Sequence, residues 1–124
     1  MRNFELLIHV PHASTVIPDW AQEAFLIDQD EAREEATISA DLFTDKLAQE
    51  AWPGATIVAA ELSRIVVDVE RYADDAAEEM SQVGRGMIYT HSHTGKRIKR
   101  DLSPDMREWV RQTWYVTHWE RLRN

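Results

Sequence analysis

The stretch FELLIHVPH, residues 4–12, decides how the chain begins to fold. It is a short apolar run, and Pro11 removes a backbone donor and keeps the preceding residue extended. Such a run predicts a buried strand over residues 4–10, with His12 in the loop directly after it. Open α/β sheets bind ligands beyond the carboxyl ends of their strands. His12 is therefore a candidate functional residue, and a structural hydrogen-bonding histidine is the alternative.

Further strands and helices are predicted downstream by the same kind of pattern. Runs of apolar and β-branched residues predict strands over 55–60, 65–69 and 87–90. Helical spacing and capping signals predict helices over 19–25, 38–52 and from Ser103-Pro104 to the last residues. Residues 28–35 and 74–82 are polar and are expected to be exposed. Alternating helices and strands indicate an α/β domain with a mixed, largely parallel sheet flanked by helices.

Composition limits the classes of protein to consider. The 124 residues, 44% hydrophobic and 29% charged, suit one globular domain. The absence of cysteine excludes disulfides, thiolate metal sites and a cysteine nucleophile, so a metal would need histidine, carboxylate or water ligands. The net charge of −8 argues against nucleic acid or an anionic membrane as a partner. No secretory signal or long apolar run is visible, which favours a cytoplasmic protein.

Charge is distributed unevenly along the chain. Residues 19–50 contain ten acidic and two basic side chains, whereas residues 85–124 contain nine basic and four acidic ones. We expect the two regions to attract one another as faces of one domain, or the basic region to meet an acidic ligand. The basic cluster at residues 96–100 allows a further hypothesis, a small regulatory protein that uses this cluster.

Asp68 is a notable candidate because it interrupts an apolar run. Burying an isolated carboxylate costs several kcal/mol, so Asp68 needs a cation, a metal or several donors as partners. Arg64 and Arg71 flank it in sequence, and Arg64 lies on the same face of the predicted strand. One interpretation is a buried aspartate–arginine brace. The other is an arginine pair that holds a substrate carboxylate, because a guanidinium matches a carboxylate at two points.

The other titratable residues have simpler interpretations. Asp41 lies near the start of a predicted helix, where an acidic residue complements the helix dipole without any function. The pair His91 and His93 could bind a metal, but the following Thr-Gly-Lys favours a solvated turn. His118 fits a partly buried histidine where the final helix meets the sheet. Glycine-rich phosphate loops and a Gly-x-Ser-x-Gly motif are absent, which favours a metal or carboxylate site over nucleotide or serine chemistry.

Five stretches, in the same order as in the family, resemble the N-formylglutamate amidohydrolases. They are Val10–Ser14 with Ile17-Pro18, Ser39–Leu47, Ser63–Arg71, Gly86–Thr90 with Gly95-Lys96, and Trp114–Leu122. The first resembles the opening Val-Pro-His-Ser-Gly segment of the family. The third resembles its Ser-Arg-x-Val-Val-Asp-x-Asn-Arg strand, and the last its Tyr-x-Pro-His-His-x-x-Leu stretch.

This resemblance implies a fold like that of zinc carboxypeptidases and aspartoacylases, and hydrolysis of N-formyl-glutamate or a related N-acyl amino acid. The implied cofactor is Zn²⁺ or another divalent metal that activates water. The partner would be a small-molecule carboxylate. Carried over by motif, His12 and Asp41 would be metal ligands. Arg64 and Arg71 would be catalytic residues that also bind the substrate carboxylate, and Asp68 would belong to the substrate-binding set by orienting an arginine. His118 would be a further catalytic residue that lines the site.

The sequence departs from the family pattern at several positions. Glu70 stands in place of asparagine, Thr117 in place of proline, and Trp119 in place of the second histidine. Family members continue through an Asp-x-His-Ser segment with another metal-ligating histidine. Residues 1–124 are therefore expected to form one domain that lacks the C-terminal part of the family.

These departures leave a second hypothesis. The chain would be a non-catalytic or fragmentary relative that binds a carboxylate ligand or a protein partner through Arg64 and Arg71. Apolar surface left without its usual cover, including Trp109, Trp114 or Trp119, would favour a homo-oligomer.

Overall fold

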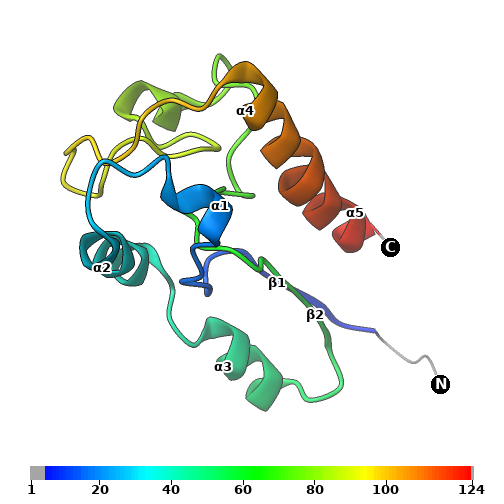
Figure 1. Ribbon diagram of the computed structural model, residues 1–124. Coiled ribbons are helices and arrows are strands. Elements are labelled where there is room, and N and C mark those ends of the chain that lie inside the picture. Colours follow the sequence, from blue (N-terminus) through cyan, green and yellow to red (C-terminus); the bar gives the residue numbers. More distant parts are fainter. Residues whose placement is uncertain (1–4, 124) are drawn as a thin grey trace.

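The centre of the fold is a pair of parallel strands. The computed structural model describes residues 5–123, so Phe4 of the first predicted strand lies outside the described residues. β1 (Leu7–Val10) pairs with β2 (Thr56–Ala59), and Ile8 lies opposite Ile57. In Figure 1, α3 (Thr44–Ala51) lies on one side of the pair and α5 (Thr117–Arg123) on the other. The α/β class is confirmed, with a small parallel sheet.

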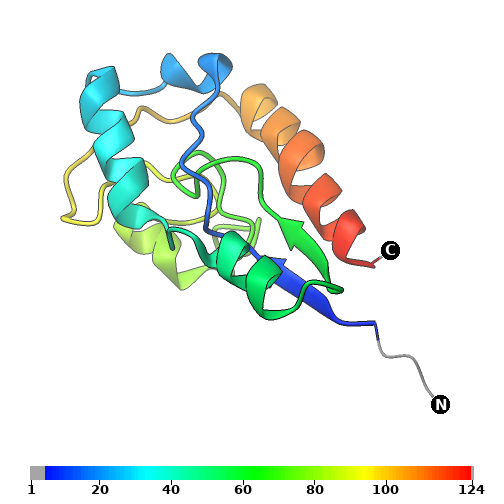
Figure 2. The same ribbon diagram turned by 90° about the horizontal axis from the view of Figure 1, so that it is seen from below.

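The predicted final helix is also confirmed. α4 (Pro104–Val110), the π-helical η2 (Arg111–Val116) and α5 follow one another as a continuous rod (Figure 2). The helix begins as its sequence signal predicts, because the Ser103 hydroxyl accepts a hydrogen bond from the Met106 amide at 3.1 Å. The last residue, Asn124, lies outside the described part of the chain.

The predicted strands over 65–69 and 87–90 are wrong. Residues 63–71 form consecutive turns, in which the Val66 amide bonds to the Ser63 carbonyl and the Arg71 amide to the Asp68 carbonyl. Residues 87–90 contribute only an isolated bridge between Arg85 and Tyr89. The apolar pattern in these segments reports burial, and a buried turn satisfies it as well as a strand does.

The region around residues 28–52 also differs from the prediction. The polar stretch is part of α2 (Gln29–Ser39), whose first turn is capped by Asp28. The chain then leaves the helix, and Phe43 adopts a φ of 68° before α3 begins. The buried face of α2 consists of Ala32, Glu35, Ala36 and Ser39. These small or polar residues are spaced as on an amphipathic helix, but they lack the large apolar side chains that make such a face visible in a sequence.

The remaining elements pack the core around the turns at 63–71. α1 (Asp19–Gln22) and the 3₁₀ helix η1 (Glu79–Val83) are short. Ala21, Leu62, Val66, Val67, Met87 and Val110 form the larger apolar cluster, and Ala36, Ile65 and Tyr89 the smaller one. Residues 63–71 are thus held in place by packing. Among the described residues, no helix has the length and apolar composition needed to cross a membrane.

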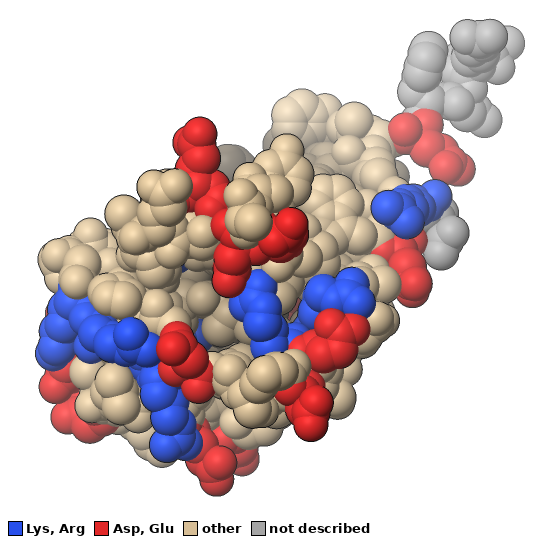
Figure 3. Space-filling model, turned by 90° about the horizontal axis from the view of Figure 1, so that it is seen from above, with Lys and Arg blue, Asp and Glu red and all other residues tan. Residues whose placement is uncertain are grey.

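The acidic and basic regions meet within the domain, as expected for two faces of one fold. Glu31 and Glu35 on α2 lie 3.4 and 3.7 Å from Lys96 and Arg85. The basic cluster at 96–100 is not a continuous patch, because Lys99 is buried and donates a hydrogen bond to the Ile65 carbonyl. On the face shown in Figure 3, basic and acidic side chains are interspersed.

Candidate functional site

Asp68 lies at the centre of a polar cluster, and its Oδ2 atom accepts hydrogen bonds from two residues, Tyr89 and Arg64. The Tyr89 hydroxyl donates to it at 2.6 Å, and the Arg64 guanidinium donates through Nη2 at 3.2 Å and Nε at 3.3 Å. The Nε of Arg71 lies 3.6 Å from the same oxygen. Asp68 is fully buried. The two guanidiniums therefore supply the compensating charge that a buried carboxylate requires.

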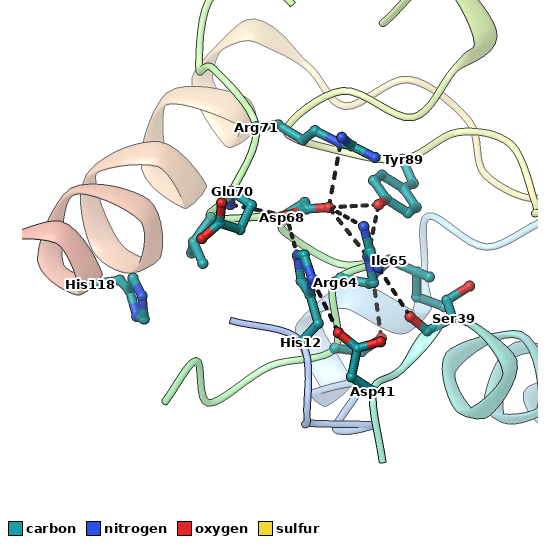
Figure 4. A network of polar contacts seen from close by, with 12 residues as sticks. His12, Ser39, Asp41, Arg64, Ile65, Asp68, Glu70, Arg71, Tyr89 and His118 are labelled. Atoms are coloured by element: carbon teal, nitrogen blue, oxygen red, sulfur yellow. Dashed lines mark hydrogen bonds and ion pairs between the residues drawn. The ribbon is translucent and has the colours of Figure 1, made fainter. Parts of the chain in front are cut away.

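The other oxygen of Asp68 connects the cluster to the end of β1. Its Oδ1 atom lies 2.7 Å from Nε2 of His12 and accepts a hydrogen bond from the Glu70 amide at 3.0 Å. Because a carboxylate can only accept, His12 carries its proton on Nε2 in this contact. The Nδ1 atom of His12 faces Asp41 at 3.8 Å (Figure 4).

Three separate segments bring these side chains together. Arg64 lies four residues before Asp68 in the sequence, and Arg71 three residues after it. The turns at 63–71 bring both guanidiniums to the Asp68 carboxylate. β1 delivers His12, as predicted for a residue after a strand. The chain between α2 and α3 lies alongside, because the Asp41 amide bonds to the His12 carbonyl at 2.7 Å. Arg64 and Asp68 therefore lie on the same side, as predicted. Turns bring them together, however, and not a strand.

The cluster keeps Asp68 ionised. Burial by itself would raise the pKa of this carboxyl, but hydrogen bonds from His12 and Tyr89 and the charges of His12 and Arg64 outweigh burial and lower the pKa to about 2. Burial and the negative charge of Asp68 together raise the pKa of Tyr89. Tyr89 thus remains a hydroxyl donor at neutral pH.

The two arginines differ in how far their donors are committed. Arg64 also donates to the Tyr89 oxygen at 3.0 Å and to the Ser39 carbonyl at 3.4 Å. By contrast, the Nε of Arg71 is buried and has no hydrogen-bond partner among the described residues. The side chain of Arg71 is 23% exposed. Arg64 is therefore the more firmly hydrogen-bonded of the two guanidiniums.

His12 and Asp41 are the candidates for metal ligands that the sequence suggested. Histidine ligands commonly donate their second ring nitrogen to a carboxylate, which is the contact between His12 and Asp68. The Nδ1 of His12 and the carboxylate of Asp41 could then face one cation. Within residues 5–123, however, no group of three histidine or carboxylate side chains is placed to hold a metal. A catalytic zinc takes three protein ligands, one more than the pair His12 and Asp41 could supply.

His118 lies apart from the Asp68 cluster, as Figure 4 shows. Its Nε2 atom contacts Nε2 of His9 at 2.7 Å, and Nδ1 of His9 lies 3.1 Å from the Glu70 carboxylate. The Glu70 carboxylate therefore contacts His9, whereas the Glu70 backbone amide donates to Asp68. The structure brings together five of the predicted site residues, which are His12, Asp41, Arg64, Asp68 and Arg71.

Sequence reasoning missed Tyr89 and Ser39 as members of the cluster. Tyr89 was expected within a strand, and no local pattern distinguishes a core tyrosine from one whose hydroxyl meets a buried carboxylate. Ser39 contributes its backbone carbonyl, which every residue possesses. The sequence did indicate that a buried Asp68 needs several hydrogen-bond donors. It did not indicate which residues those donors are.

Comparison with known proteins agrees with the fold. The family model described as N-formylglutamate amidohydrolase matches residues 4–124. A crystal structure of N-formylglutamate amidohydrolase from Ralstonia eutropha JMP134 is similar to this chain, with a TM-score of 0.77 at 23% sequence identity. The similarity covers 94% of this chain and 45% of that one, so this chain spans less than half the length of that protein. No curated protein matches the chain.

Proposed function

Because the chain belongs to the N-formylglutamate amidohydrolase family, we propose that its site hydrolyses the amide of N-formyl-glutamate or a related N-acyl amino acid. The observation that carries the proposal is the convergence of two guanidiniums and one imidazole on the buried carboxylate of Asp68. Such a substrate has a carboxylate for a guanidinium to bind and a carbonyl oxygen that gains negative charge during hydrolysis.

Arg71 is the residue we assign to the substrate carboxylate. The ion pair with Asp68 holds its Nε end, while the partly exposed side chain allows the terminal nitrogens to form a two-point contact. Arg64 is committed to Asp68, Tyr89 and Ser39. Its positive charge lies beside Asp68, as does that of Arg71, and it would stabilise a developing oxyanion there.

His12 and Asp41 are the residues that would hold a divalent metal. A metal there would polarise the amide carbonyl and lower the pKa of a water molecule. Asp68 accepts from Nε2 of His12, so in the neutral imidazole Nδ1, which faces Asp41, would be the nitrogen that binds the metal. Tyr89 supports this arrangement by donating to Asp68.

Formate release from N-formyl-glutamate tests the proposal. We expect His12→Gln to abolish release and Arg71→Ala to raise KM by about 10- to 100-fold, the loss of one charge-assisted contact. Arg33→Ala is the matched control, because Arg33 is exposed and pairs only with Asp30 within the described chain. Release that is unchanged in both His12→Gln and Arg71→Ala would contradict the proposed site.

Metal dependence needs its own measurement. Elemental analysis of the purified protein should find a divalent metal in the wild type and less of it in both His12→Gln and Asp41→Asn. Asp45→Asn is the control, because Asp45 lies four residues further along the chain, in the first turn of α3, and its side chain accepts a hydrogen bond from the Lys46 amide. Equal metal content in all four proteins would rule out His12 and Asp41 as ligands.

A second candidate function is binding of a carboxylate without hydrolysis. The observation that favours it is that no group of three histidine or carboxylate side chains within residues 5–123 is placed to hold a metal. It predicts that N-formyl-glutamate binds by calorimetry, that Arg71→Ala weakens binding, and that no formate appears with added Zn²⁺. Formate release by the wild type would exclude this alternative.

A further inference from the structure

Three side chains of the final helix donate hydrogen bonds to alternate backbone carbonyls of residues 69–73. The three bonds run from Trp119 Nε1 to the Val69 carbonyl at 3.0 Å, from the Tyr115 hydroxyl to the Arg71 carbonyl at 2.6 Å, and from Arg107 Nη2 to the Ala73 carbonyl at 2.8 Å. The helix lies at the left of Figure 4, beside the turns that carry Asp68. One helix therefore holds the backbone directly after Asp68.

The π-helical segment η2 brings the three donors onto one face of the helix. An α-helix turns by about 100° per residue, so without a break Tyr115 would lie about 80° around the axis from Arg107, and Trp119 about 120°. η2 begins after Arg107 and includes Tyr115. A π-helical turn takes one extra residue and so removes roughly 100° of this rotation. All three donors then lie within about 40° of one another.

Tyr115 completes the fixing of the Arg71 backbone. The Arg71 amide bonds to the Asp68 carbonyl at 3.2 Å, and the Arg71 carbonyl accepts from Tyr115. Both backbone polar groups of Arg71 are therefore held, and this sets the direction of its Cα–Cβ bond. The chain then enters mostly exposed bends and turns at residues 72–78, so the helix is the anchor on this side.

The contact between Arg71 and Asp68 is sensitive to this backbone. The Nε of Arg71 lies 3.6 Å from Oδ2 of Asp68 and has no hydrogen-bond partner among the described residues. Arg64, by contrast, donates to three different acceptors. The place of the Arg71 guanidinium thus depends on how its backbone is held, whereas that of Arg64 is set by its own side-chain contacts.

We infer that Tyr115 is a positioning residue, which holds the Arg71 backbone so that the Arg71 guanidinium lies against Asp68. Trp119 and Arg107 hold the carbonyls on either side in the same way. The effect of Tyr115 on catalysis rests on the proposed function, in which Arg71 binds the substrate carboxylate. Its effect on the place of Arg71 does not.

Exchange of the Arg71 Nε–H proton with water tests the positioning directly. In ¹H–¹⁵N spectra of the full chain, its signal is assigned by Arg71→Lys. Tyr115→Phe removes only the hydroxyl group and should speed this exchange by about fivefold, the value of one hydrogen bond. The Arg64 Nε–H signal should keep its exchange rate. Tyr72→Phe is the matched control, because it makes the same change at an exposed tyrosine next to Arg71.

Two results of this exchange measurement would overturn the inference. The first is an Arg71 exchange rate that is the same in Tyr115→Phe and the wild type. The second is an equal acceleration of the Arg64 and Arg71 signals, because Tyr115 would then stabilise the fold in general and not position one guanidinium.

Formate release tests the effect on catalysis. Tyr115→Phe should raise KM for N-formyl-glutamate by about fivefold with kcat unchanged, and it should add nothing in the Arg71→Ala background. The same rise in both backgrounds would overturn the inference. A wild type that neither binds nor hydrolyses N-formyl-glutamate would contradict the proposed function, and the exchange of the Arg71 proton would still decide whether Tyr115 positions this guanidinium.

Discussion

Asp68 shows how a single charged residue is kept in the interior of a small domain. Its carboxylate accepts hydrogen bonds from Arg64, Tyr89, His12 and the Glu70 amide. Taking a carboxylate out of water costs several kcal/mol, and these partners offset the cost only while the charge is present. The cluster is therefore expected to be sensitive to loss of the charge.

Replacing Asp68 with asparagine should destabilise the protein by about 3 kcal/mol, because it leaves two partly buried guanidiniums without their fully buried counter-ion. Urea unfolding monitored by circular dichroism measures the change. Asp30→Asn, in an exposed pair with Arg33, should change stability by less than about 0.5 kcal/mol. Similar losses in the two variants would show that the Asp68 charge is not compensated as described.

His118 should make stability depend on pH. Burial, with the nearby His9 and Arg121, lowers the pKa of His118 from 6.5 to about 4. Between these values the unfolded chain binds a proton that the folded protein does not. Stability is therefore complete above about pH 6.5 and falls as the pH drops toward 4, by about 2 to 3 kcal/mol at pH 4.5.

Urea unfolding at pH 7 and 4.5 checks this dependence. His118→Phe should lose about 2 kcal/mol less between the two pH values than the wild type. His91→Phe changes a histidine that contacts Thr90 and neither His9 nor His118, and it should retain the dependence of the wild type. An identical loss in His118→Phe and the wild type would assign the acid sensitivity to other groups.

The break between α2 and α3 is the element that places Asp41 beside His12. It depends on Phe43, which has a φ of 68° although it is not a glycine. Left-handed backbone is unfavourable for residues with a Cβ atom. The Phe43 ring is 64% exposed, and Lys46 lies 5.5 Å from its centre. Little packing therefore compensates for the strain of this backbone conformation.

Phe43→Gly should be more stable than Phe43→Ala by about 1 kcal/mol. Both variants lack the ring and its contact with Lys46, so the comparison isolates the Cβ atom. Thermal unfolding of the two variants under the same conditions gives the difference. If alanine were equal or better, the left-handed conformation at position 43 would be contradicted.

At the scale of the whole molecule, α2 is tied to the loops at 85–99 by buried charge. Glu35 accepts from the amide of His93 at 3.0 Å and from the Ser39 hydroxyl at 2.9 Å, and Arg85 lies 3.7 Å away. Arg85 also lies over the Tyr89 ring, 4.4 Å from its centre. Arg85 thus links Glu35 to Tyr89, whose hydroxyl donates to Asp68.

Glu35→Gln should destabilise the protein by about 2 to 3 kcal/mol, because Arg85 and His93 lose their buried carboxylate. The neighbouring Glu34 is exposed, and Glu34→Gln should change stability by less than about 0.5 kcal/mol. Chemical denaturation of both variants provides the comparison. Equal stability of the two would mean that α2 is held by its alanine face alone.

Local pattern was enough to predict several parts of this protein. The strands around Ile8 and Ile57, the helix that begins after Ser103, and the burial of residues 65–69 all follow from apolar spacing and capping residues. The need of Asp68 for cationic partners, with Arg64 and Arg71 as candidates, follows from the cost of burying a carboxylate. These properties depend on neighbours within a few positions along the chain.

Only the tertiary structure decided the conformation of residues 65–69 and the partners of their polar atoms. A buried run can be a strand or a series of turns, and the choice here depends on packing against Met87 and Ala36 from distant segments. The donation from Tyr89 to Asp68 and the contact of His9 with His118 join residues 21 and 109 positions apart. Hydrogen bonds of this kind depend on where side chains point in space, and no periodicity in the sequence encodes that direction.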